Sequence, residues 1–244
     1  MNSSRIAELL QPFLSPEILS FRAQPKGSQS EPSGAVEESA VLSPAQLQSI
    51  STYIDLLLRW NARINLTSVR DPEEIVTRHF GESLFAARCL FPSTIHVGAD
   101  ALVRPTGKLI DLGSGAGFPG LPIKIWNPSL HITLIESNHK KVAFLREVIR
   151  ALGLTDVNVF AGRAEDFPPD RQPNTTVTLR AVENFGTILP VAARLVPPSG
   201  RLALLIGESQ VEAASKLVGG FEWSKPAHIP LSTARVLWVG RNRA

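Results

Sequence analysis

Residues 109–120 read LIDLGSGAGFPG, and the fold of this chain follows from that stretch. Its apolar beginning is typical of a parallel strand that is covered on both faces of a sheet. The glycines after it allow a turn with positive φ, which brings backbone amides close to a bound molecule. Their spacing is G-x-G-x-G, and Phe118 stands where a dinucleotide fingerprint has its third glycine. The stretch therefore predicts a strand, a helix and a ligand-binding turn between them that contains Gly113, Gly115 and Gly117.

A carboxylate closes the next predicted strand. Glu136 follows the apolar run at 131–135, and a carboxylate at this position can accept both hydroxyls of a ribose. The alternative is an ordinary turn with a solvated glutamate, but two features at the matching spacing favour a cofactor site. The form D-x-G-x-G-x-G, which begins at Asp111, resembles the first motif of S-adenosylmethionine-dependent methyltransferases. That resemblance implies S-adenosyl-L-methionine as the cofactor, with the turn around its amino acid end.

Composition excludes several classes to which this protein could belong. The chain has 244 residues, a formal net charge of +3 and a single cysteine, Cys89. One cysteine excludes an internal disulfide and a multi-cysteine metal site, and we predict no metal. No stretch approaches the roughly 18 apolar residues of a membrane span, and the N-terminus lacks a charged segment followed by an apolar core. These features predict a soluble, cytoplasmic protein without a membrane partner, whose mildly basic surface suits an anionic polymer.

Two parts of the chain precede the predicted sheet, and both contain helices. Residues 1–41 comprise a short amphipathic helix and a flexible linker, the latter with almost no large apolar side chains from residue 22 to about 40. Residues 42–92 form a helical cap, in which the capping-box sequence SPAQ at 43–46 begins a helix from about Pro44 to Asn61. The sequence DPEE at 71–74 begins a second helix. The apolar face of the first short helix consists of Ile6, Leu9, Leu10 and Phe13.

Residues 93–244 are predicted to form a Rossmann-like domain. Helical patterns alternate with strands in this part, which predicts a doubly wound, mainly parallel α/β sheet. Ligands bind to such sheets at the carboxyl ends of the strands. The strands are expected near 108–112, 131–136, 157–161, 176–180 and 201–206, with a last pair around 222–240. The candidate residues at their carboxyl ends are Gly113, Glu136, the segment 163–165 and Arg180.

Further motifs join the glycine turn in a defined order. They are WN at 60–61, NLTSVRDP at 65–72, RHF at 78–80, SL at 83–84, DLGSGAGFPG at 111–120 and KKVAFL at 140–145. With these motifs the chain resembles, from about residue 42 to its C-terminus, the RsmG (GidB) family of bacterial methyltransferases. The resemblance implies a class I S-adenosylmethionine-dependent methyltransferase fold with an N-terminal helical cap. It also implies methylation of guanine N7, at position 527, in the 16S ribosomal RNA of the small subunit.

The resemblance assigns roles to individual residues. The family's cofactor contacts correspond to Gly113 and Phe118 in the turn, Ala164 and Glu165 after the third strand, and Arg180 after the fourth. Glu136 is expected to hold the ribose, and Ala164 with Glu165 is expected to read the edge of the adenine. Arg180 is the expected catalytic residue, because a guanidinium at a strand end can pair with the cofactor carboxylate or with an RNA phosphate. The alternative is an arginine in an ordinary surface ion pair.

Two positions depart from the family pattern. The family usually has Ser-Arg-Ala where this chain has Leu179-Arg180-Ala181. It usually has Lys-Gly at the end of the fifth strand, where this chain has Ile206-Gly207. The second departure removes a positive charge beside the expected site.

The expected chemistry depends on positioning. Guanine N7 has a lone pair and no proton, so its methylation needs no general base, and alignment supplies much of the catalysis. The chain has no Asn/Asp-Pro-Pro-Tyr segment for amine methylation, and Cys89 lies outside a Pro-Cys context suited to attack on a pyrimidine. Asn65 and His79 can point toward the base, although capping a loop or satisfying the core is the commoner role of such side chains.

The expected partner is 16S rRNA or the small ribosomal subunit, and we expect a monomer. Two groups of cations can contact its phosphates: Arg59, Arg63, Arg70 and Arg78 in the helical cap, and Lys140, Lys141, Arg146 and Arg150 after Glu136. Three other functions fit parts of the sequence. They are a methyltransferase acting on a small molecule or a protein, a nicotinamide-dependent oxidoreductase, which Phe118 disfavours, and a non-catalytic RNA-binding factor, to which Ile206 points.

Overall fold

The computed structural model of this chain describes residues 1–15, 41–92, 94–95, 102–103, 107–169, 172–181 and 184–243. The linker expected between residues 22 and 40 lies outside the described residues. Within these ranges, no helix is long and apolar enough to span a bilayer.

The main sheet has eight strands, and five of them are parallel. These five are β3 (Lys108–Leu112), β4 (His131–Glu136), β5 (Val157–Ala161), β6 (Thr176–Arg180) and β7 (Arg201–Gly207), in the spatial order β5-β4-β3-β6-β7. The predicted parallel strands are therefore confirmed. The order reverses between β3 and β6, which is the switch point where open α/β sheets bind ligands.

The other strands complete one side of this sheet. β10 (Arg235–Asn242) pairs antiparallel with β7, and both β8 (Phe221–Trp223) and β9 (Ala227–His228) pair antiparallel with β10. A separate two-stranded ladder joins β1 (Thr94–Ile95) to β2 (Leu102–Val103). The sheet is therefore mainly parallel, with an antiparallel side in which β10 pairs along the whole of β7.

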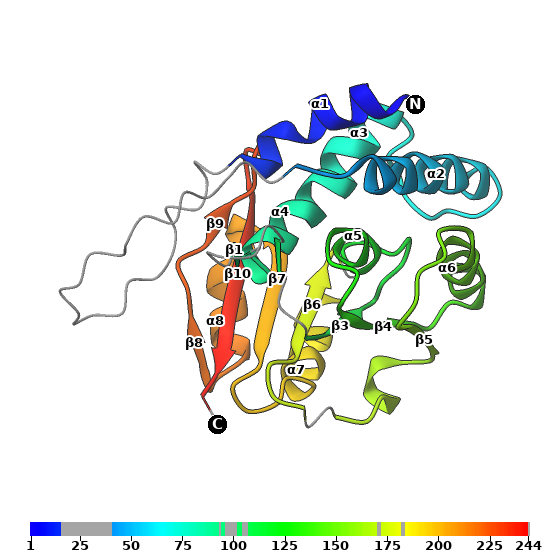
Figure 1. The fold of residues 1–244 in the computed structure, drawn as a ribbon. Coiled ribbons are helices and arrows are strands. Elements are labelled where there is room, and N and C mark those ends of the chain that lie inside the picture. Colours follow the sequence, from blue (N-terminus) through cyan, green and yellow to red (C-terminus); the bar gives the residue numbers. More distant parts are fainter. Residues whose placement is uncertain are drawn as a thin grey trace.

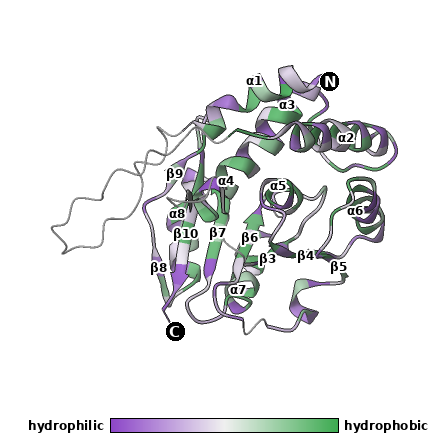
Figure 2. Ribbon diagram, viewed as in Figure 1, coloured by the Kyte–Doolittle hydropathy of each residue, from purple (hydrophilic) through white to green (hydrophobic). Residues whose placement is uncertain are grey.

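Helices cover both faces of the main sheet (Figure 1). α5 (Gly120–Trp126) and α6 (His139–Ala151) lie on one face with the N-terminal helices, and α7 (Phe185–Arg194) and α8 (Val211–Leu217) lie on the other. Successive strand residues belong to opposite cores, so that Leu109 packs in the first core and Ile110 in the second. Figure 2 shows β6 and β7 as largely hydrophobic between these layers. Burial on both faces is the reason that the central strands are mostly apolar, and polar side chains within them such as Asp111 and Thr178 are paired with one another.

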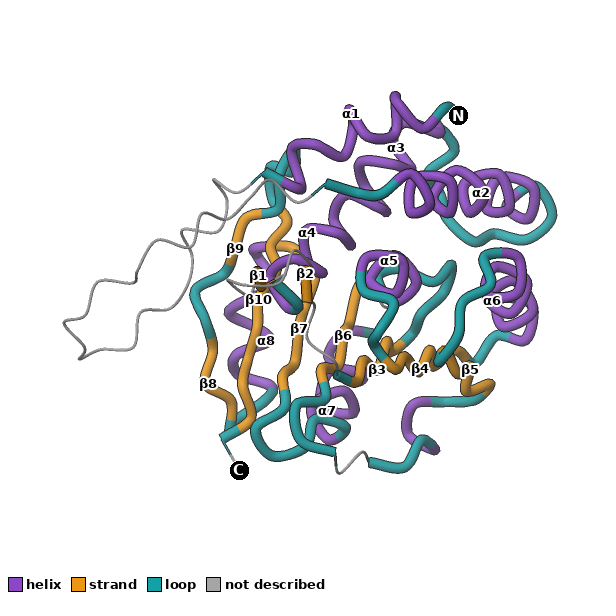
Figure 3. The backbone as a smooth tube through the Cα atoms, in the orientation of Figure 1, coloured by secondary structure: helices purple, strands orange, loops and turns teal. Residues whose placement is uncertain are grey.

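The N-terminal helices gather at one end of the molecule (Figure 3). α1 (Ser3–Leu14) buries Ile6, Leu10 and Phe13, which confirms the predicted apolar face. α2 (Pro44–Asn61) has the predicted bounds, and its capping box is present: the Ser43 hydroxyl accepts from the Gln46 amide, while the Gln46 side chain accepts from the Ser43 amide. These helices share a continuous core with α5 and α6. The division between a helical cap and a sheet domain stays a prediction.

The second predicted helix contains a widened segment. Asp71 caps α3 (Pro72–Glu74), and the chain continues as a π-helix, η2 (Ile75–Gly81), into α4 (Glu82–Leu90). Gly81 lies directly beneath the ring of Phe13, where a Cβ would overlap that ring. π-Helical segments often occur at functional sites. This one carries Arg78 and His79 to the carboxyl end of β6.

Candidate functional site

The glycine turn after β3 has one open face and one packed face. Gly113, Gly115 and Gly117 all have positive φ, of 70°, 56° and 90°. A Cβ at Gly115 would meet only the carbonyl oxygen of Gly113, at 3.8 Å, so this face is open. A Cβ at Gly117 would overlap the Tyr53 hydroxyl and lie 2.7 Å from Cδ1 of Leu121. Gly117 therefore lets α2 approach the turn, whereas Gly115 leaves room for a ligand.

Tyr53 connects the turn to the helical cap. Its buried hydroxyl donates to the carbonyl of Ala116, and its ring stacks on Phe118 with centroids 5.3 Å apart. Burial raises the pKa of Tyr53 well above its usual value, so the hydroxyl stays protonated and able to donate. Phe118 is buried by this contact. Tyr53 of α2 thus holds the shape of the turn on its packed face.

Glu136 lies against the turn at the end of β4. Its Oε2 accepts from the Gly115 amide at 2.9 Å, and its Oε1 accepts from the Asn138 amide at 2.7 Å. The carboxylate is therefore held at the end of β4, beside the open face of Gly115. Each carboxylate oxygen has a further lone pair that can accept a hydroxyl.

Asp111 supports the turn from below. It is buried, its Oδ1 accepts from Thr178 Oγ1 at 2.8 Å, and its Oδ2 accepts from the Gly120 amide at 3.2 Å. Burial raises the pKa of this carboxyl to about 6, while these hydrogen bonds oppose the shift. Asp111 therefore joins β3, β6 and the start of α5, and it faces the protein rather than the ligand side.

Ala164 and Glu165 lie beyond the end of β5, in the short 3₁₀ helix η3 (Ala164–Asp166). The Gly162 amide donates to the carbonyl of Glu136 at 3.1 Å, which holds this segment next to the end of β4. Ala164 is buried and the Glu165 side chain is exposed. The segment therefore adjoins the turn and Glu136 at the same edge of the sheet.

Arg180 ends β6 in a buried position. Its Nη2 donates to the carbonyl of Arg78 at 2.8 Å, lies 3.2 Å from Nδ1 of His79 and pairs with Glu82 Oε2 at 3.1 Å. Its Nη1 is buried and has no hydrogen-bond partner within the described residues. Burial lowers the pKa of Arg180 to about 10, so the guanidinium remains charged at neutral pH. One donor of a buried cation is thus left for an anionic or carbonyl group.

Glu82 pairs with two arginines, a role that was not predicted from the sequence. It is buried, and its Oε1 accepts from Nη2 of Arg235, the first residue of β10. Arg235 lies opposite Gly207 in the antiparallel ladder, next to the pair formed by Val236 and Ile206. The chain therefore has a cation at the end of β7, although the departure at Ile206 predicts the loss of one. The available signal for this residue was its position: Glu82 lies between the motifs RHF at 78–80 and SL at 83–84.

His79 fills the space between Arg180 and the loop 62–71. Its ring stacks on Phe118 with centroids 4.8 Å apart, and its Nε2 lies 2.8 Å from Thr67 Oγ1. Burial, together with Arg180 and other arginines, lowers its pKa to about 3, so the ring is neutral. Because Arg180 donates to Nδ1, Nε2 carries the hydrogen and donates to Thr67. A neutral ring with both nitrogens engaged positions its neighbours and does not transfer protons.

Asn61, rather than Asn65, organises this loop. Asn61 Oδ1 accepts from the amides of Leu66 and Thr67, at 2.9 and 3.1 Å, and its Nδ2 donates to the carbonyl of Thr67. Asn65 is exposed. Among the residues that the structure describes, no group of three or more potential ligands is placed to hold a metal ion.

The edge of the sheet around these residues fits S-adenosyl-L-methionine. Gly115 provides an open cradle that a Cβ would fill, Glu136 provides carboxylate oxygens for a ribose, and Arg180 provides an unpaired donor. A doubly wound sheet with a D-x-G-x-G-x-G turn after its first parallel strand and an acidic residue after the neighbouring strand defines a class I methyltransferase. The chain belongs to the GidB family, rRNA small subunit methyltransferase G, whose model matches residues 46–228.

Individual relatives agree with this family. The chain is similar to ribosomal RNA small subunit methyltransferase G of Roseiflexus castenholzii, with 38% identity over 208 residues, 81% of this chain and 84% of the relative. It is also similar to the protein of that name from Xylella fastidiosa, with 41% identity over 194 residues, 78% of this chain and 84% of the relative. A solved SAM-dependent methyltransferase from Aquifex aeolicus is 15% identical, with a TM-score of 0.46, over 55% of this chain and 81% of that one. The family assignment rests on the sequence matches.

Proposed function

We propose that this protein transfers a methyl group from S-adenosyl-L-methionine to N7 of a guanine in 16S rRNA, at position 527. Membership of the rRNA small subunit methyltransferase G family over most of the chain supports the choice of RNA. The observation that supports S-adenosyl-L-methionine as the methyl donor is the contact between Gly115 and Glu136 beside the open face of the turn. We further propose that the protein acts as a monomer in the cytoplasm, where its substrate is found.

The cofactor contacts that we propose lie along one edge of the sheet. Glu136 accepts the ribose hydroxyls, and Ala164 with Glu165 holds the adenine. The unpaired Nη1 of Arg180 binds the cofactor carboxylate or the RNA. The turn surrounds the amino acid end through Gly113 and Gly115, while Gly117 and Phe118 keep its shape by packing on Tyr53 and His79.

The residues of this site bind and orient, and none of them needs to remove a proton. When bound, S-adenosyl-L-methionine supplies an electrophilic methyl group, and guanine N7 offers a lone pair without a hydrogen. His79 is neutral and engaged at both nitrogens, and Asp111 is occupied by Thr178 and Gly120. Catalysis then depends on alignment of the lone pair with the methyl group. The buried Arg180 and the partly exposed Arg235 hold the carboxyl ends of β6 and β7 positive toward an RNA substrate.

The presence of Arg235 also bears on the alternative of a non-catalytic RNA-binding factor. That alternative depended on the loss of a cation at Ile206. Arg235 supplies a guanidinium at the neighbouring position of the ladder, paired with Glu82. The charge at this end of the sheet therefore favours the enzyme.

The decisive experiment uses purified protein, S-adenosyl-L-methionine and small ribosomal subunits that lack the modification. The RNA is digested afterwards and analysed by mass spectrometry. We expect 7-methylguanosine at one site, which fragment analysis assigns to position 527 or elsewhere. Binding of the cofactor by calorimetry without formation of 7-methylguanosine would contradict the proposed reaction and favour a divergent methyltransferase or an RNA-binding factor. Light scattering of the purified protein tests the monomer.

A further inference from the structure

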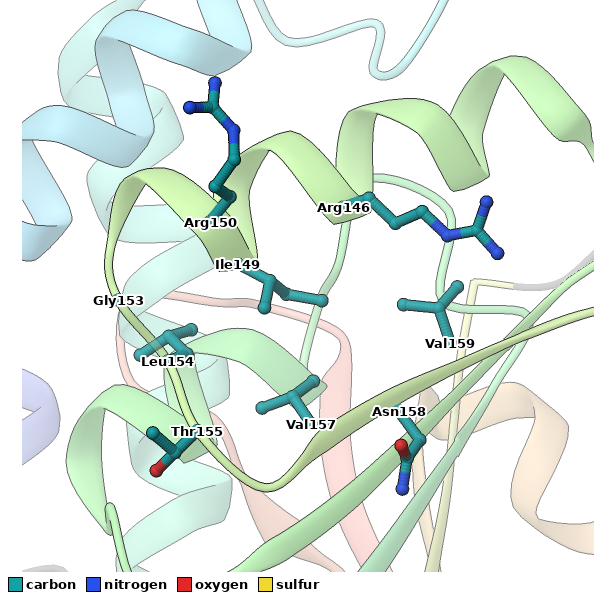
Figure 4. A pocket seen from close by; sticks show the side chains of 9 residues that line it. All are labelled: Arg146, Ile149, Arg150, Gly153, Leu154, Thr155, Val157, Asn158 and Val159. Carbon is teal, nitrogen blue, oxygen red and sulfur yellow. The ribbon is translucent and has the colours of Figure 1, made fainter.

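A hollow lies between α6 and the edge strand β5, apart from the glycine turn and Arg180. Its volume is about 480 Å³. Its floor consists of half-buried aliphatic side chains, and Figure 4 shows Ile149, Val157 and Val159 converging there. Arg146 and Arg150 stand on the helix above this floor: the Arg146 side chain extends toward Val159, and the Arg150 side chain extends outward (Figure 4). The hollow thus combines an apolar floor with a cationic rim.

The two rim arginines are free to bind an anion. Both side chains are exposed, and neither guanidinium forms an ion pair or hydrogen bond with another residue that the structure describes. The carboxylate between them in the sequence, Glu147, instead accepts from Trp60 Nε1 at 2.9 Å and pairs with Arg59 at 3.4 Å. Arg146 and Arg150 are four residues apart on α6, which places them about 6 Å apart along the helix axis. They form one cationic stripe without a neutralising partner.

The hollow lies along the second half of α6 and the first half of β5, and both elements continue from there to the edge that holds the proposed cofactor site. β5 is the last strand of the sheet, so its outer edge has no neighbouring strand. The strand runs from the hollow at Val157 to Ala161, and Ala164 follows at the carboxyl edge. α6 begins at His139, three residues after Glu136, and runs in the opposite direction to reach Arg150. A polymer lying along α6 and β5 therefore connects the hollow to the edge that holds Glu136.

We propose that the hollow between α6 and β5 binds a single-stranded segment of the RNA substrate that flanks the target guanine. Arg146 and Arg150 pair with its phosphates, and the aliphatic floor contacts a ribose or the face of a base. Cationic grooves follow the backbone of single-stranded nucleic acid, and apolar side chains beside the cations can pack against its sugars and bases. This inference rests on the proposed function for the identity of the RNA. It assigns the α6–β5 side, rather than the β8–β10 side, to substrate binding.

The test removes the two charges and measures binding to 16S rRNA as a function of salt. For R146Q/R150Q we expect about tenfold weaker binding at physiological salt, and a slope of log K against log salt that is flatter by roughly 1.4, as expected for two lost phosphate contacts. R146K/R150K should restore most of the slope, because it keeps both charges. The matched control is K225Q/R241Q, which removes two exposed cations on the β8–β10 side and should leave the slope unchanged. Calorimetry should give the same affinity for S-adenosyl-L-methionine in all four proteins.

Steady-state kinetics, and a comparison of intact small subunits with naked 16S rRNA, complete the test. With small subunits as substrate, R146Q/R150Q should raise KM for the RNA and leave kcat unchanged. An unchanged salt slope with naked 16S rRNA would overturn the inference, and a KM rise confined to intact subunits would then assign the surface to a ribosomal protein. If the unaltered protein forms no 7-methylguanosine but R146Q/R150Q still flattens the slope, the proposed reaction fails while the RNA-binding surface stands.

Discussion

Glu82 and Arg180 form a buried ion pair between the start of α4 and the end of β6. Glu82 Oε2 lies 3.1 Å from Arg180 Nη2, and the two side chains are only 5% and 7% exposed. Arg235 pairs with the other oxygen of the same carboxylate. Glu82 therefore balances two cations, one at the end of β6 and one at the start of β10. Buried charges of this kind are costly when one partner is lost.

Glu82→Gln should destabilise the fold strongly. The substitution leaves Arg180 buried against a neutral amide and removes the partner of Arg235, and breaking a buried pair such as Glu82–Arg180 costs about 3 kcal/mol or more. Urea unfolding at neutral pH measures the loss. Glu74→Gln is the control, because its exposed pair with Arg78 at 3.0 Å contributes at most about 1 kcal/mol. Equal midpoints for the two variants would contradict the role of Glu82.

Arg180→Ala should weaken the binding of S-adenosyl-L-methionine about 10- to 100-fold, which corresponds to one hydrogen bond to a charged group. Arg180→Lys should recover little of this affinity, because an ammonium does not reproduce the fork of donors that spans Arg78, Glu82 and Nη1's partner. Calorimetric titration measures both variants, with Arg241→Ala as an exposed arginine control. Full cofactor affinity together with full activity in Arg180→Ala would show that Arg180 has no part in the site.

Gly115→Ala and Gly117→Ala should separate binding from folding. A methyl group at Gly117 overlaps the Tyr53 hydroxyl and approaches Leu121, so we expect a loss of about 3 kcal/mol in the free energy of unfolding. At Gly115 the methyl group meets open space, and the positive φ alone costs about 1 kcal/mol. Gly115→Ala should instead reduce cofactor affinity, since its methyl group enters the open cradle. Unfolding and calorimetry of both variants test this division, which a reversed pattern would refute.

His79 and Asp111 should act oppositely on stability in acid. The pKa of His79 is lowered from 6.5 to about 3, so the unfolded chain takes up a proton that the folded state refuses, and stability falls as pH drops below 6.5. The pKa of Asp111 is raised from 3.8 to about 6, so the folded state takes up the proton first, and stability rises as pH drops from 6 toward 4. Each slope approaches about 1.4 kcal/mol per pH unit between pH 6 and pH 4.

The two contributions therefore offset one another, and single variants should uncover them. Relative to the unaltered protein, Asp111→Asn should lose stability between pH 6 and pH 4, because only the His79 effect remains. His79→Gln should gain stability over the same interval. Urea unfolding at pH 4.5, 5.5 and 6.5 gives these differences. Parallel pH profiles for the three proteins would show that neither group is perturbed in this way.

Local signals in the sequence specified most of the elements. The capping box at Ser43 and Gln46 depends on residues three apart, and the helix that it begins has the predicted bounds of Pro44 and Asn61. The parallel strands were predictable because burial on both faces requires an uninterrupted apolar run. The π-helical segment η2 was not predicted, and it packs at Gly81 against Phe13 of another helix, a contact between residues far apart in the chain.

The sequence by itself determined the glycine turn, the carboxylate at Glu136 and the family, because each is written in a short run of neighbouring residues. Only the tertiary structure decided which side of the turn is open, since Tyr53 reaches Gly117 from α2. It also decided the charge at the strand ends, where Glu82 meets an arginine 153 positions away in the chain. Helix caps and hydrophobic periodicity depend on residues close together in the sequence, whereas a buried charge finds its partner only when the sheet and the N-terminal helices pack together.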